Sequence, residues 1–168
     1  MAFADLLFSE LESACHIIHP KTKAQYDSQN GCVRALLPMD EEGEIFVLTE
    51  INLFQPTEDL YYAQFYTTLE TDITHKDEFE RALQELNCYC PLGALGIFQS
   101  DAPQLYHKYT LVLEADEPDE ISINRAAVIL GAIYGYIRSI FYVAAGIARG
   151  AISYQDALDN SLLQPFEN

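Results

Sequence analysis

Positive charge is scarce in this chain of 168 residues, in which 9 Lys and Arg stand against 26 Asp and Glu for a formal net charge of −17. A field of that sign repels phosphate backbones, and no cluster of basic residues with interleaved aromatic side chains offsets it. We therefore exclude nucleic acid as an expected partner. Acidity of this size keeps a small protein soluble and can steer basic partners toward it, although most acidic surfaces are only solvated.

Targeting signals and disulfide frameworks are also missing. The start of the chain has no basic segment, and acidic residues interrupt its apolar positions, so it does not form a secretory signal. The four cysteines, Cys15, Cys32, Cys88 and Cys90, fit reduced thiols better than disulfides in a chain of this length. We therefore expect a cytoplasmic protein.

Sequence patterns for catalysis, metal binding and cofactor binding are absent as well. The chain has no G-x-S-x-G, no H-E-x-x-H and no complete EF-hand loop. His16 and His19 could share a metal, but a structural zinc site needs further ligands, and the spacing of Cys88 and Cys90 is too short for zinc motifs. We expect no enzyme, no metal and no cofactor.

What the chain does contain is a series of amphipathic segments separated by turn signals. Their spacing predicts, in chain order, a helix over 3–18, strands within 33–40, 44–54 and 59–73, a helix over 75–87 and strands over 94–100 and 104–115. Thr74 and Asp77 form the expected cap of the second helix, and residues 101–103 form a turn. An acidic loop at 116–120 then precedes a long helix over 126–148, and Ser153 begins a short helix that ends near Pro165.

Strands joined by short turns indicate an antiparallel sheet. We therefore predict a single α+β domain over residues 1–168, with a five-stranded antiparallel sheet and helices packed on one face. The predicted order is α-βββ-α-ββ-α-α.

The most apolar stretch, residues 125–146, raises the question of a membrane span, because a helix over 126–148 is about 34 Å long. A central Arg138 opposes insertion, and no cluster of Lys and Arg flanks the stretch, so we do not expect a span. On a helical projection the residues divide by size. The bulky side carries Ile129, Leu130, Ile133, Ile137, Ile140, Phe141 and Ile147, edged by Tyr134 and Tyr136, and the small side carries Ala127, Gly131, Ala132, Gly135, Ala145 and Gly146, with Arg138, Tyr142 and Arg149 nearly in line.

The two sides suit different neighbours. The bulky side is expected to cover the sheet, whereas the small side lets a second element approach closely, with arginines available for a carboxylate. That second element is either the last helix of this chain or another subunit.

A second candidate surface lies on the predicted sheet. If Ile45, Val47, Phe65, Tyr109 and Leu111 face the helices, the opposite face carries Phe46, Leu48, Tyr62, Tyr66, Tyr106 and Val112. Such apolar and aromatic patches often mark partner sites, although scattered surface tyrosines are the alternative. The candidate partner-binding residues are Phe46, Leu48, Tyr62, Tyr66, Tyr106, Gly131, Gly135, Arg138, Tyr142 and Arg149.

The order of elements, together with FERALQELNCYCPLGALGIFQSDAPQLYHKYTLVLEAD at 79–116, resembles the YbjN-like proteins and the class I type III secretion chaperones, which share a fold. The matching positions are Asn87, Pro91, Gly93, Phe98 and the strand over 105–113. The resemblance covers roughly the last two thirds of the chain. It implies a small, acidic, cytosolic, usually dimeric protein without catalysis, which in the chaperone branch holds an extended segment of a client.

Three hypotheses follow. The first is a chaperone-like homodimer that binds a protein or an extended peptide through the aromatic sheet face or the small side of the long helix. The second is a small-molecule-binding or enzymatic domain with a pocket between helices and sheet, lined by His107 and carboxylates. The third is an assembly subunit that buries the Gly131 and Gly135 side permanently against another protein.

Overall fold

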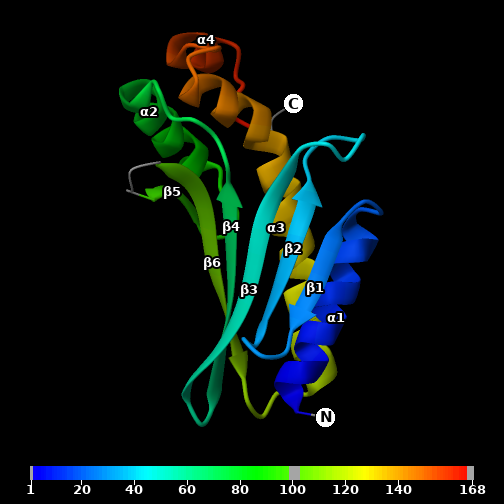
Figure 1. Ribbon diagram of the computed structural model, residues 1–168. Helices are drawn as coiled ribbons and strands as arrows, with labels where there is room; N and C mark the ends of the chain where they lie inside the picture. The colour runs from blue at the N-terminus through cyan, green and yellow to red at the C-terminus, as the bar shows by residue number, and fades with distance from the viewer. Residues whose placement is uncertain (1, 99–102, 166–168) are drawn as a thin grey trace.

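The computed structural model describes residues 2–98 and 103–165 (Figure 1). In chain order its elements are α1 (Phe3–Ile18), β1 (Lys23–Asp27), β2 (Cys32–Pro38), β3 (Phe46–Thr57), β4 (Leu60–Leu69), α2 (Lys76–Cys88), β5 (Ala94–Phe98), β6 (Gln104–Glu114), α3 (Asp119–Ala148) and α4 (Tyr154–Asp159). The strands form one antiparallel sheet in the order β1-β2-β3-β4-β6-β5. The predicted α+β class is confirmed.

The predicted number of strands is wrong, because the described part of the chain forms six strands rather than five. The missed strand is β1, a short edge strand with the polar sequence KAQYD. It is held by backbone pairing with β2 and by Tyr26, whose ring stacks on Phe8 at 5.2 Å and whose hydroxyl donates to Asp5 Oδ1. An edge strand with one such anchor needs no apolar alternation, so the periodicity gave no signal.

The four predicted helices are present, with three corrections. The short last helix ends at Asp159 rather than near Pro165, because Ser161 adopts a left-handed φ of 54° that does not continue a helix. The long helix begins at Asp119 and not at 126, because Asp119 and Glu120 lie in its first turn, where their charge favours the helix dipole. The predicted cap of α2 is wrong, since His75 is the N-cap and makes no side-chain cap bond. The cap of α4 is confirmed, because the Asp156 N–H donates to Ser153 Oγ at 3.0 Å. The turn predicted at 101–103 lies mostly outside the described residues.

The start of α2 is instead closed by the end of α3. The backbone N–H groups of Thr74 and His75 both donate to the Ala148 carbonyl, at 2.9 and 3.0 Å. The Thr74 hydroxyl also donates to that carbonyl. At the other end of α2, the Asn87 side chain exchanges two hydrogen bonds with the backbone of Leu95 in β5. Both ends of α2 are therefore fixed by parts of the chain that follow it.

All four helices lie on one side of the sheet, and the core lies between (Figure 1). Strand side chains alternate between buried and accessible positions, so that Val47, Phe65 and Leu111 point into the core as predicted. Tyr109 is half-buried against that core, while Ile45 precedes β3 and is exposed. Within residues 2–98 and 103–165, no helix covers the opposite face of the sheet.

Candidate functional site

α3 lies in the helix layer with α1 along its first half and α2 beside its second half, and its bulky side is buried as predicted. Leu130, Ile133, Ile137, Ile140 and Ile147 are fully buried, whereas Ile129 is half-buried. Two tyrosine hydroxyls fix the helix to its neighbours, each as donor to a carbonyl: Tyr134 to Pro38 at 2.7 Å and Tyr136 to Leu86 at 2.8 Å. Burial raises the pKa of both tyrosines, so both stay protonated at neutral pH.

The small side of α3 has two different environments. Its C-terminal end is filled from within, because a Cβ added at Gly146 would lie 2.7 Å from Ile152 Cδ1. Its middle is open, since apart from the adjacent residues and nearby backbone of α3 itself, no heavy atom among the described residues lies within 4 Å of a Cβ built at Gly131 or Gly135. α4 packs against α2 rather than over these glycines. The chain's own last helix therefore does not fill the middle of this side.

The open part of α3 exposes two large apolar side chains. Val128 is 63% exposed and Tyr142 is 52% exposed. We call the line formed by Asn124, Val128, Gly131, Gly135, Arg138 and Tyr142 the outward face of α3. Open space beside two glycines lets a second element approach this face closely, where it would contact the exposed Val128 and Tyr142.

Charge along α3 is also unusual in so acidic a chain. Between Glu120 and Asp156 the sequence contains no acidic residue, and Arg125, Arg138 and Arg149 are its charged side chains. Arg125 forms an ion pair with Glu117. Arg138 and Arg149 have no carboxylate partner within the described ranges.

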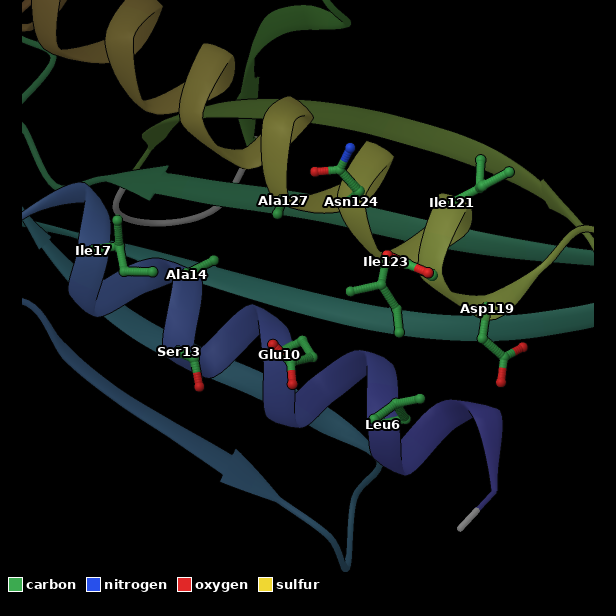
Figure 2. A pocket seen from close by; sticks show the side chains of 11 residues that line it. Leu6, Glu10, Ser13, Ala14, Ile17, Asp119, Ile121, Ile123, Asn124 and Ala127 are labelled. Carbon is green, nitrogen blue, oxygen red and sulfur yellow. The ribbon is translucent and has the colours of Figure 1, made fainter.

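A groove of about 920 Å³ lies between α1 and the first half of α3 (Figure 2). Its apolar lining comes from Leu6, Ala14, Ile17, Ile121, Ile123 and Ala127. Ile17 is 84% exposed and Ile121 is 51% exposed. Glu10, Asp119 and Glu120 supply its charges, all of one sign. In Figure 2, Leu6 and Ile123 lie between the two helices, and Asn124 projects from the side of α3 that faces away from α1.

Sequence reasoning missed this groove. The apolar spacing over 3–18 identified the core side of α1, which contains Leu7, Leu11 and Cys15, but did not show that α3 runs beside it. One signal was available. Ile17 and Ile18 are adjacent on the helix, so both cannot face the same core, and one large apolar side chain must lie outside it.

The uncovered sheet face carries the aromatic residues that the sequence placed there. Leu48 and Tyr62 are exposed, while Phe46, Tyr66 and Tyr106 are half-buried. The rings of Tyr66 and Tyr106 stack at 5.3 Å, and Tyr106 lies over Gly96, where a Cβ would be 2.6 Å from the ring.

This face is divided rather than continuous. A row across the strands contains the Arg34–Glu50 ion pair, then Tyr66 and Lys108 in register. It separates Leu36 and Leu48 from a second apolar row, formed by Phe54, Tyr62 and Val112. The sheet face is therefore a mixed surface.

His107, the candidate for a pocket between helices and sheet, is fully buried on the core side of β6. Its Nε2 lies 2.6 Å from the Leu92 carbonyl, so Nε2 carries the proton, and Nδ1 has no partner among the described residues. Burial lowers the pKa of His107. His107 lines neither the groove between α1 and α3 nor four smaller surface pockets in the described ranges, and its ring is fully buried.

Other chemically reactive groups are similarly inactive. Burial raises the pKa of the Cys15 thiol to about 12, and burial also raises the pKa of Cys90. Both thiols are therefore protonated at neutral pH and poorly nucleophilic. Across the described residues, no group of three His, Cys, Asp or Glu side chains could hold a metal ion.

Comparison with known proteins returned no match among family models, curated proteins or solved structures. Within the described ranges, α3 has the length and composition of a membrane-spanning helix, with a mean hydropathy of 1.6 over its most apolar window. The aliphatic side of α3 packs on the sheet, which accounts for much of that apolar character.

Proposed function

We propose that this chain is a non-catalytic protein-binding module that works as a homodimer, with the outward face of α3 as its self-association surface. The observation that carries this proposal is the open space over Gly131 and Gly135, on a face where Val128 and Tyr142 are largely exposed. Glycines let a second helix approach closely, and burying the exposed apolar side chains contributes about 25 cal/mol per Å².

The uncovered sheet face has the second role in this proposal. With the helix layer engaged by the second copy, the aromatic residues Tyr62, Tyr66 and Tyr106 remain available to a polypeptide partner. Tyrosine suits such contacts because it offers large apolar area and a hydroxyl with little conformational entropy. The resemblance to secretion chaperones supports an extended segment as that partner.

The dimer is tested by light scattering coupled to size-exclusion chromatography. The chain has a mass of 19.0 kDa, and we expect a particle of about twice that mass at micromolar concentration. Gly135→Arg should shift the particle toward the monomer, because it places a long charged side chain where the second helix approaches. A single species at the monomer mass over the accessible concentration range would contradict the proposal.

Gln84→Arg is the matched control, since Gln84 is an exposed residue of α2. It adds the same charge to a helix surface outside the proposed interface and should leave the mass unchanged. Equal effects of the two substitutions would show that net charge rather than the α3 face controls association.

The alternative of a pocket between helices and sheet has no specific observation in its favour. The groove that exists lies between two helices, and His107 is enclosed by core side chains.

A further inference from the structure

The groove between α1 and α3 and the outward face of α3 form one continuous surface. Asn124 and Ala127 belong to the groove lining, and Val128 and Gly131 follow on the next turn of the same helix. This surface has unlike ends. Glu10, Asp119 and Glu120 make the end at the start of α3 acidic, whereas Arg138 and Arg149 make the other end basic.

The charge pattern favours one relative orientation of two copies. If two α3 helices packed in parallel, acidic ends would meet acidic ends and arginines would meet arginines, which is unfavourable across an interface. Antiparallel packing places each basic end against an acidic end.

The spacing along α3 fits the same arrangement. Asn124 and Tyr142 are 18 residues apart, five full turns at 3.6 residues per turn, so they project from the same side of the helix. Each lies nine residues from Ile133, about 13 Å along the axis. A two-fold axis beside Ile133 therefore places Tyr142 of one copy opposite Asn124 of the other, and brings the Gly131 and Gly135 backbones of both copies together.

We infer that the groove between α1 and α3 is the docking site for the second half of α3 from a second copy of this chain, packed antiparallel. This inference rests on the proposed homodimer and specifies its geometry. Tyr142 of the second copy lies over Asn124, at the edge of the groove formed by α3, next to Ala127 of the groove lining. Arg149 of the second copy lies close to Asp119 and Glu120.

The size of the surface requires that the groove takes part. α3 has 30 residues, so its outward side is about 45 Å long, and at a width of about 10 Å it offers only about 450 Å² per copy. Stable specific dimers bury about 800 Å² per partner. The walls of the groove, including the exposed Ile17 and Ile121, supply further area next to α3.

Disulfide trapping tests the orientation in a Cys88→Ser, Cys90→Ser background, in which the remaining Cys15 and Cys32 are buried. Asn124→Cys and Tyr142→Cys chains are prepared separately, then mixed and oxidised. We expect a covalent dimer from the mixture and little from either variant alone, because in the antiparallel arrangement the two copies of position 124 are about 27 Å apart along the axis. Covalent dimer from Asn124→Cys alone would indicate parallel packing and overturn the inference.

Charge reversal provides a second readout that does not depend on cysteine. Arg149→Glu should raise the dissociation constant of the dimer by about tenfold, and combining it with Glu120→Arg should restore much of that loss. Independent, additive effects of the two substitutions would contradict a contact between these positions. Circular dichroism and thermal melting confirm that each variant is folded.

These experiments distinguish the homodimer from its antiparallel geometry. A chain that stays monomeric in light scattering would contradict both the homodimer and its geometry. A dimer that gives no mixed crosslink and shows additive charge effects keeps the homodimer but places its interface elsewhere, which refutes the groove as the docking site.

Discussion

Gly93 and Gly135 show how the same residue type serves different purposes in this chain. Gly93 has φ of +80°, and a Cβ there would lie 2.2 Å from the Lys108 carbonyl oxygen. It is therefore required by the turn that leads into β5. Gly135 lies within a helix, has open space where its Cβ would be, and is required by nothing else among the described residues of its own chain.

Alanine substitutions at these two glycines should have opposite effects on the stability of the monomer. Gly135→Ala should raise the free energy of unfolding by about 0.5 to 1 kcal/mol, because alanine has the higher helix propensity. Gly93→Ala should lower it by more than 1 kcal/mol, because a side chain at that φ meets backbone. Urea unfolding at low protein concentration measures both. Destabilisation by Gly135→Ala under those conditions would show that the glycine has a role within the monomer.

His107 couples folding to pH. Because burial lowers its pKa in the folded state from the ordinary value of 6.5, the folded protein holds the neutral form and the unfolded chain binds the proton more readily. The stability contributed by the neutral side chain is therefore present above pH 6.5 and is lost as pH falls below it. Near this ring lie Tyr136 and Cys90, and the raised pKa of each keeps it uncharged throughout this range.

We therefore expect the free energy of unfolding of the natural chain to decrease between pH 7.5 and 5.5 more steeply than that of His107→Gln, whose amide can still donate to the Leu92 carbonyl. Urea titrations at several pH values compare the slopes. Equal slopes would mean that other groups account for the pH dependence.

At the scale of elements, α3 is held in place by the hydroxyls of Tyr134 and Tyr136. Removing either hydroxyl leaves a buried carbonyl with one hydrogen bond fewer, so Tyr134→Phe and Tyr136→Phe should each cost about 1 kcal/mol of stability. Tyr142→Phe is the matched control, because Tyr142 is exposed and its substitution should change monomer stability by less than about 0.5 kcal/mol. Thermal unfolding of the three variants in dilute solution tests this ranking, and a cost at Tyr142 equal to the others would argue against it.

The elements that the sequence predicted well are those whose burial is periodic. The two sides of α3 and the two faces of β3, β4 and β6 follow from side-chain spacing, because a single layer of core determines which positions are apolar. β1 was not predicted because backbone pairing and one aromatic contact suffice to hold an edge strand, so its sequence has no apolar alternation. The groove between α1 and α3 was not predicted because it depends on the distance between two helices that are far apart in the chain, and no local sequence pattern determines that distance.

At the scale of the whole molecule, net charge opposes the self-association that we propose for the α3 surface. Two copies of charge −17 repel each other at long range, and salt reduces this repulsion as the screening length falls from about 30 Å at 0.01 M to about 10 Å at 0.1 M. In the proposed dimer, the contacts of Arg149 determine how the two copies are oriented, whereas the total charge determines their repulsion at long range.

The dissociation constant of the dimer should therefore decrease as NaCl rises over this range. Sedimentation velocity at fixed protein concentration measures the change. A dissociation constant that increases with salt would show that ion pairs across the interface outweigh the net repulsion.

The double hydrogen bond from Thr74 and His75 to the Ala148 carbonyl also bears on the order of folding. The start of α2 has no side-chain cap, and its backbone donors find their acceptor more than seventy residues later in the chain. We therefore expect the first turn of α2 to stay frayed during synthesis until the end of α3 has emerged. The helix layer is then completed only after α3 has formed. A truncation of α3 before Ala148 would leave the backbone N–H groups of Thr74 and His75 without their acceptor.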